Sequence, residues 1–143
     1  MSYSTELYFD QDSENKIKEH LNIIKREGIE NLFYNLGAFP HISLAVYNDN
    51  INHLELIKNL EKFQLNKVNI SFKNIGYFCS NENAIFLCPK INYELLDLHK
   101  RYHEEFKEYI KNEREYYLPE NWIPHCSIAF EVSNEDFKAK QNN

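Results

Sequence analysis

A seven-residue pattern occurs twice in this chain and constrains its fold more than any other feature. Residues 40–46 and 124–130 both read Pro-His-x-Ser-apolar-Ala-apolar, with His41 and His125 as the histidines. In a chain with six histidines, chance gives a His-x-Ser or His-x-Thr triplet only roughly 0.4 times. Two longer copies, each beginning at one of only four prolines, therefore indicate an internal duplication.

The spacing of apolar residues follows the same order in both halves of the chain. The first half predicts strands at 6–9, 39–47 and 68–78, and helices at 12–28 and 54–60. Asp12 and Ser13 offer N-cap oxygens to the first helix, and Gly28 offers its C-cap. The second half predicts strands at 84–88 and 125–132, a helix at about 92–112, and a helix start at Ser133 and Asp136.

The two halves have nearly equal spacing, because Leu7 precedes Phe86 by 79 residues and His41 precedes His125 by 84. We expect one domain over residues 1–143, a bilobal duplication with lobe repeats at about 5–78 and 84–140. Strands with one polar face that alternate with helices favour an α+β fold. In this fold two mostly antiparallel sheets and outer helices surround a central cleft. We expect the second lobe to be shortened at the C-terminus and to lack the final strand of the repeat.

Composition and charge exclude several other classes. A chain with 43% hydrophobic and 27% charged residues, three glycines and four prolines is neither collagen-like nor disordered. The net charge of −6 argues against strong binding of duplex DNA. The sequence has no run of 18 apolar residues, and its N-terminus is neither basic nor apolar. We therefore expect no membrane span, no signal peptide and a cytoplasmic location.

The three cysteines are interpreted as structural. Cys79, Cys88 and Cys126 are odd in number and lack Cys-x-x-Cys spacing, which argues against a disulfide framework and a zinc ribbon and predicts buried thiols. Cys126 lies next to His125, as in a Cys-His nucleophile pair. Strand alternation places it on the opposite face, so we expect it in the core.

The other four histidines carry weaker signals. His99 and His103 have the i, i+4 spacing of metal ligands, but they lack the glutamate of the H-E-x-x-H motif and lie in or beside the apolar arc of their helix. We interpret them as semi-buried packing residues. His20 and His53 have no partner in the sequence pattern and are expected at the surface.

The repeated strands bring chemistry-bearing side chains to one face. A period of two places His41 and Ser43 together with Ala45, opposite the apolar residues between them, and the second copy does the same with His125 and Ser127. Two imidazoles at one site suit in-line cleavage of a phosphodiester. One takes a proton from the attacking oxygen and the other gives a proton to the leaving oxygen, without a metal. The serine hydroxyls can donate hydrogen bonds to non-bridging phosphate oxygens.

These motifs resemble the two-histidine phosphoesterase superfamily, and within it the bacterial 2'-5' RNA ligase-like proteins. The resemblance extends through both His-x-Ser strands, residues 75–78, residues 84–89 and the run 121–125. It implies a bilobal fold with the paired motifs facing a central groove, and metal-independent chemistry on 2',3'-cyclic phosphates or 2',5'-linked nucleotides. Carried over by position, His41 and His125 are the acid–base pair, and Ser43 and Ser127 hold the phosphate.

Two features depart from the family pattern. The family usually has threonine where this chain has serine, which keeps the hydroxyl but loses the χ1 restriction of a β-branched side chain. Relatives continue after residue 143 through a full helix and one more strand. An unpaired edge of the second sheet would then favour pairing with another copy of the chain, so a dimer is one expectation.

Aromatic residues near the motifs are candidates for stacking on a base, since stacking holds single-stranded nucleotides of any sequence. The candidates are Phe39, Tyr77, Phe78, Tyr117 and Trp122, of which Tyr77, Phe78 and Trp122 are assigned to substrate binding. Residues of this kind are more often part of a core than a stacking platform.

The leading hypothesis is a metal-independent, cofactor-independent phosphoesterase. It would act on nucleoside or RNA 2',3'-cyclic phosphates, or on 2',5'-phosphodiester linkages, with a small nucleotide or an RNA 3'-end as its partner. One alternative is a nucleotide-binding or RNA-end-binding module of the same fold with little or no turnover. Another is a structural or regulatory protein that dimerises through the unpaired sheet edge.

Overall fold

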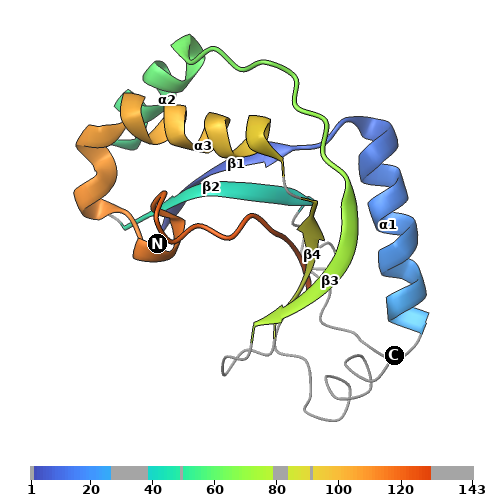
Figure 1. The fold of residues 1–143 in the computed structure, drawn as a ribbon. Coiled ribbons are helices and arrows are strands. Elements are labelled where there is room, and N and C mark those ends of the chain that lie inside the picture. The colour runs from blue at the N-terminus through green and yellow to red at the C-terminus, as the bar shows by residue number, and fades with distance from the viewer. Residues whose placement is uncertain (1, 27–38, 49, 79–83, 91, 130–143) are drawn as a thin grey trace. The chain divides into compact units, whose positions relative to one another are not determined.

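The fold mixes short sheets with helices, as the computed structural model shows for residues 2–26, 39–48, 50–78, 84–90 and 92–129 (Figure 1). The strands are β1 (Tyr3–Tyr8), β2 (His41–Tyr47), β3 (Phe72–Phe78), β4 (Ala84–Pro89) and β5 (Cys126–Ala129). The α-helices are α1 (Gln11–Arg26), α2 (His53–Lys62) and α3 (Tyr93–Glu105), and two 3-10 helices follow at Lys107–Asn112 and Glu115–Tyr117. The mixed α and β composition that the sequence predicts is confirmed.

The strands form two small antiparallel sheets. One sheet contains β1 and β2, and the other has the order β3-β4-β5. In the second sheet β4 and β5 are antiparallel, with Phe86 opposite Ser127 and Leu87 opposite Cys126. The expected antiparallel sheets are therefore confirmed, whereas the bilobal duplication and the central cleft stay predictions.

The chain separates into two compact units, and each takes segments from both halves of the sequence. The first unit consists of Met1–Glu6, Ser43–Ser71 and Pro89–Pro124, and the second of Leu7–Ile42, Phe72–Cys88 and His125–Asn143. This division differs from the expected repeats at about 5–78 and 84–140. Both motif histidines, His41 and His125, belong to the second unit.

Helix starts follow capping side chains, and the cap of α1 differs from the sequence prediction. Asp10, rather than Asp12 or Ser13, caps α1, because its carboxylate accepts a hydrogen bond from the Ser13 N–H at 2.7 Å. Asparagine side chains cap the other two helices, Asn52 for α2 and Asn92 for α3. Gly28, the expected C-cap of the first helix, lies outside the described residues.

The helix expected at 92–112 is split in two. α3 ends at Glu105, and Phe106 leaves the helical region with φ −104° and ψ 29°. The Tyr109 N–H then bonds to the Phe106 carbonyl at 3.0 Å, a three-residue spacing that starts the 3-10 helix. Phe106 and Tyr109 are both buried, so this tighter turn places two aromatic rings in the core.

The strand expected at 68–78 begins four residues late, at Phe72. The carbonyl groups ahead of it bind the loop before α3 instead of a sheet neighbour. The Ser71 carbonyl accepts a hydrogen bond from the backbone N–H of Lys90 at 2.7 Å. The Asn69 carbonyl accepts one from the side-chain amide of Asn92 at 2.6 Å. The end of β5, expected at Val132, and the predicted helix start at Ser133 and Asp136 lie outside the described residues.

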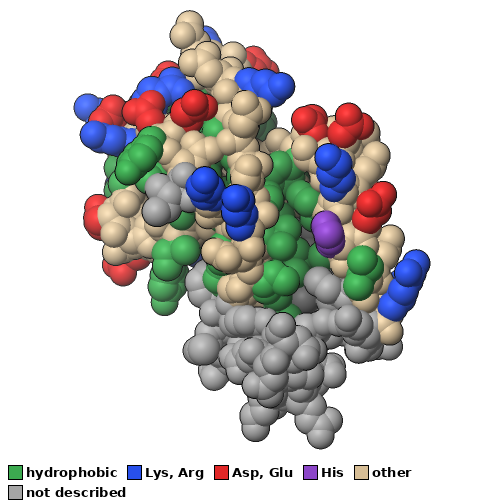
Figure 2. Space-filling view, turned by 45° about the vertical axis from the view of Figure 1, so that its right-hand side comes forward, with side chains coloured by type: hydrophobic (Ala, Val, Ile, Leu, Met, Phe, Trp, Pro, Cys, Tyr) green, Lys and Arg blue, Asp and Glu red, His purple; other side chains and the backbone are tan. Residues whose placement is uncertain are grey.

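The surface carries charges of both signs. On the face shown in Figure 2, Lys and Arg side chains lie among Asp and Glu side chains. In α1 the acids Asp12 and Glu14 stand in the first turn and the bases Lys25 and Arg26 in the last, which suits the helix dipole. None of the helices in the described ranges has both the length and the apolar character needed to cross a membrane.

The second sheet has a close approach that only glycine permits. A Cβ atom on Gly76 in β3 would overlap the ring of Phe86 and lie 2.8 Å from the sulfur of Cys88, both in β4. Phe86 is buried and cannot swing out to solvent. Gly76 therefore makes room for the Phe86 ring within the sheet.

We predict that Gly76→Ala lowers the free energy of unfolding by about 1–3 kcal/mol, because the added methyl group would clash with the Phe86 ring. Urea denaturation followed by circular dichroism measures the loss. Asn74→Ala, at an exposed position of the same strand, is the matched control. Equal stability of Gly76→Ala and Asn74→Ala would contradict the packing argument.

Candidate functional site

The two copies of the repeated motif show the same burial pattern. His41 and Ser43 in β2 are half-buried, whereas the intervening Ile42 and the following Leu44 are buried. In and just before β5, His125 and Ser127 are half-buried, and Cys126 and Ile128 are buried. The expected alternation of a polar and an apolar face is therefore confirmed at these four positions of each motif.

Fewer residues on the polar face of β2 are partly exposed than the alternation of the sequence predicts. Ala45 and Tyr47 share the face of His41 and Ser43, but both are buried. The packing of the first unit covers this end of the strand. The partly exposed portion of the polar face is thus confined to the His41 and Ser43 side chains.

A hydrogen bond links His41 to Cys126 within the second unit. The backbone N–H of His41 donates to the thiol of Cys126, the residue that follows His125. Burial raises the pKa of this thiol to about 12, and the His41 N–H opposes the rise. Cys126 is therefore a buried neutral thiol, as expected, and a structural link rather than a nucleophile.

The His41 ring is oriented by its own backbone. Its Nδ1 lies 2.7 Å from the Phe39 carbonyl oxygen, which can only accept, so Nδ1 carries a hydrogen and donates. This contact fixes the tautomer of the neutral ring, in which Nε2 is the nitrogen that can act as a base. This is the arrangement that a histidine needs to act as general acid or general base through one defined atom.

The His125 ring is oriented by packing. It meets the ring of Phe86 edge-on, with a centroid distance of 5.3 Å and an interplanar angle of 62°. Phe86 is paired with Ser127 across the sheet, and side chains of paired residues lie on the same face. Phe86, Ser127 and His125 therefore share one side of the second sheet, and Gly76 makes room for the Phe86 ring.

Two exposed aromatic residues stand beside His41 in the second unit. The ring of Tyr8, which is 62% exposed, lies 6.1 Å from the His41 ring at an angle of 57°. Phe39 is 57% exposed, and the ammonium group of Lys18 lies 5.4 Å from its ring centroid. The sequence predicts a stacking role for Phe39 but not for Tyr8, although the alternation of Leu7, Tyr8 and Phe9 in the first strand carries the signal.

The other aromatic candidates have different surroundings. Tyr77 and Phe78 belong to β3, but their side chains lie outside the described residues. Tyr117 is half-buried, and burial raises its pKa. Trp122 is 9% exposed, with its ring stacked on His99. Among the described candidates, Phe39 is the one that presents a large exposed ring.

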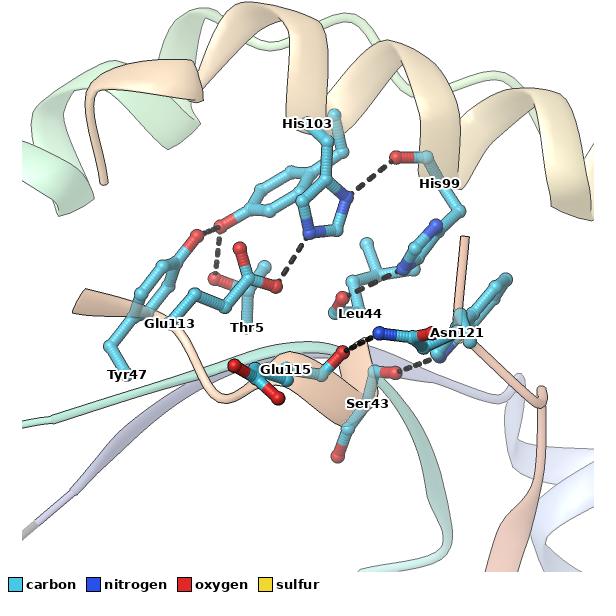
Figure 3. Close-up of polar contacts among 11 residues, drawn as sticks. Thr5, Ser43, Leu44, Tyr47, His99, His103, Glu113, Glu115 and Asn121 are labelled. Carbon is cyan, nitrogen blue, oxygen red and sulfur yellow. Dashed lines mark hydrogen bonds and ion pairs between the residues drawn. The ribbon is translucent and has the colours of Figure 1, made fainter. Parts of the chain in front are cut away.

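Buried polar groups of the first unit support the continuation of β2 (Figure 3). The indole N–H of Trp122 donates to the Ser43 carbonyl at 3.1 Å, and Nε2 of His99 donates to the Leu44 carbonyl at 3.0 Å. Burial and the neighbouring His103 lower the pKa of His99 to about 3, so its imidazole is neutral near pH 7. His99 is thus a buried hydrogen-bond donor rather than a surface base.

His99 is connected by hydrogen bonds to two further buried residues, His103 and Glu113. Nδ1 of His103 donates to the His99 carbonyl at 2.9 Å, and Nε2 of His103 lies 2.5 Å from a Glu113 carboxylate oxygen. Three buried hydroxyl groups form a hydrogen-bonded chain in the same unit. The Tyr102 oxygen lies 2.7 Å from the Thr5 oxygen and 2.6 Å from the Tyr47 oxygen. His99 and His103 are packing residues as expected, but they are fully buried rather than semi-buried.

Glu113 is a buried neighbour of His103 that the sequence pattern does not predict. Its pairing with His103 depends on the 3-10 turn after α3 and on its bridge to Tyr47, neither of which has a pattern in the sequence. His53 is exposed as expected, but it stacks on Tyr3 at 4.9 Å and so has a partner. Over the described residues, no three His, Cys, Asp or Glu side chains are grouped as a metal site.

Comparison with known proteins gives one match. The protein-family model described as the 2'-5' RNA ligase superfamily matches residues 15–142. The matched region contains β2 and β5, and with them both His-x-Ser motifs. No curated protein matches the chain.

The low pKa of His99 predicts a loss of stability in acid. Its folded-state pKa of about 3 lies below the unfolded value of about 6.5, so the unfolded chain binds the extra proton between these values. The neutral His99 ring therefore makes its full contribution to the free energy of unfolding above about pH 6.5, and this contribution falls as the pH drops towards 3. We expect His99→Gln to reduce this slope by at most about 1.4 kcal/mol per pH unit.

Urea midpoints at pH 7, 6 and 5 measure the slope for the wild type and for His99→Gln. His53→Gln, which replaces an exposed histidine of the same unit, is the control and should keep the wild-type slope. Identical slopes for His99→Gln and the wild type would contradict the assignment of a neutral, buried His99.

Proposed function

Because the chain belongs to the 2'-5' RNA ligase superfamily, we propose that it is a phosphoesterase of the two-histidine type. Its proposed substrates are nucleoside or RNA 2',3'-cyclic phosphates, or 2',5'-phosphodiester linkages. One observation carries the proposal. Two strands linked through the His41 N–H and Cys126 each present a half-buried His-x-Ser pair, while the residues between are buried.

In the proposed hydrolysis, one imidazole accepts a proton from water as the water oxygen attacks the phosphorus. The bond from phosphorus to one ribose oxygen breaks, and the other histidine, as imidazolium, donates its proton to that leaving oxygen. The product is a phosphomonoester beside a new hydroxyl group. The two histidines end with exchanged protonation states, which proton exchange with solvent resets.

When the 5'-hydroxyl group of an RNA attacks the phosphorus in place of water and the bond from phosphorus to the ribose 3' oxygen breaks, the same two proton transfers give a 2',5' linkage. His41 and His125 have equivalent places in their motifs, so the orientation of the substrate decides which one is the base. The proposed role of Ser43 and Ser127 is to donate hydrogen bonds to the non-bridging phosphate oxygens. Charge grows on these oxygens in the transition state. This scheme assigns both proton transfers to side chains and needs no metal or cofactor.

We predict that His41→Ala and His125→Ala each lower kcat/KM for an RNA with a 2',3'-cyclic end by about a hundredfold or more. The wild-type reaction, measured in EDTA, should show a bell-shaped pH profile, because it needs one protonated and one neutral histidine. His20→Ala, at an exposed position of α1, is the control and should keep full activity.

Full activity in either histidine variant would refute the acid–base assignment. Binding of a 2'-phosphorylated or 3'-phosphorylated nucleotide without any turnover would favour the binding-module alternative. Mass spectrometry of the products from a panel of cyclic phosphates identifies which ribose oxygen leaves.

The proposed position for the nucleobase is the pair of exposed rings beside His41. Tyr8 and Phe39 belong to the same unit as His41 and offer aromatic faces on which any base can stack. Tyr77 and Phe78 remain proposed contributors from β3. A base stacked there would leave its ribose phosphate near the His41 ring.

We predict that the double variant Tyr8→Ala/Phe39→Ala raises KM for a nucleoside 2',3'-cyclic phosphate about tenfold, since stacking contributes roughly 1–3 kcal/mol per base. It should leave KM for ribose 2',3'-cyclic phosphate, which has no base, unchanged. Tyr93→Ala, at a residue that is 82% exposed in the other unit, is the control. An equal effect on both substrates would contradict the stacking role.

A further inference from the structure

Trp122 is occupied by contacts inside the protein. One face of its indole lies parallel to the His99 ring, with a centroid distance of 3.6 Å and an interplanar angle of 3°. Its N–H donates to the Ser43 carbonyl. The side chain is therefore used by the first unit itself, and a nucleobase has no exposed indole face to stack on.

The partners of this stacked pair are two successive carbonyl groups of β2. Trp122 binds the Ser43 carbonyl at 3.1 Å and His99 binds the Leu44 carbonyl at 3.0 Å. His99 is itself fixed, because its own carbonyl accepts a hydrogen bond from His103 at 2.9 Å. The two rings hold the backbone at the point where β2 carries the Ser43 hydroxyl.

We infer that Trp122 and His99 are positioning residues that fix the backbone of Ser43, and through it the hydroxyl that binds the substrate phosphate. The inference rests on the proposed function.

The chemical consequence is an effect on turnover. A hydroxyl that donates to a non-bridging oxygen is most effective when its position is set before the charge develops. If the Ser43 backbone loosens, the substrate still binds through its other contacts, but the transition state loses an oriented donor. Loss of either ring contact should therefore lower kcat more than it raises KM.

The experiment uses Trp122→Phe, which keeps an aromatic ring against His99 but removes the N–H donor. We expect kcat for a nucleoside 2',3'-cyclic phosphate to fall about tenfold while KM stays within about threefold. Tyr116→Phe, at a residue that is 82% exposed in the same unit, is the aromatic control and should match the wild type.

A double-mutant cycle separates positioning from general destabilisation. In a Ser43→Ala background the oriented hydroxyl is absent, so Trp122→Phe should cause little further loss of kcat. Full multiplication of the two losses would overturn the inference, because Trp122 would then act independently of Ser43.

His99 gives a second route if Trp122→Phe fails to fold. His99→Leu removes the donor to the Leu44 carbonyl and should lower kcat, whereas His99→Gln supplies an amide donor and should recover part of it. No recovery by His99→Gln at equal thermal stability counts against the inference. Wild-type protein without turnover would overturn the proposed function and this inference together, whereas active wild type with an equally active Trp122→Phe would overturn the inference alone.

Discussion

The alternating burial of two short strands is the constraint on which the rest of this structure depends. Ile42 and Cys126 are buried, so their neighbours His41 and His125 must point to the other side of the strand. The apolar core thereby sets the direction of the polar side chains. The contact with Phe86 then orients the His125 ring, and the hydrogen bond to the Phe39 carbonyl orients the His41 ring.

Much of this arrangement could be predicted because it depends on local periodicity. Residues within a few positions of one another determine the strands around His41 and His125 and the α3 helix at 93–105. The same local pattern determines that Cys126 is buried. The capping of α1 by Asp10 was misassigned because several acceptors adjoin the helix start, and geometry selects among them.

The parts that the sequence did not reveal are contacts between residues far apart in the chain. His99 meets the Leu44 carbonyl across 55 positions, and Trp122 meets the Ser43 carbonyl across 79. Glu113 finds His103 only because α3 changes to a 3-10 helix after Phe106. No periodic pattern encodes such pairings, since each depends on where a whole element has packed. Trp122, which the sequence predicts as a substrate contact, takes part in one of these long-range pairings through its bond to the Ser43 carbonyl.

The support of β2 through main-chain carbonyls has a consequence for sequence variation. Trp122 and His99 recognise backbone oxygens, and a backbone oxygen is the same whatever side chain its residue carries. Serine and threonine are therefore interchangeable at position 43 as far as this anchoring is concerned, and the choice between them alters the hydroxyl rotamer alone. A fold built in this way can tune the group that meets its substrate by mutation while the strand beneath it stays in place.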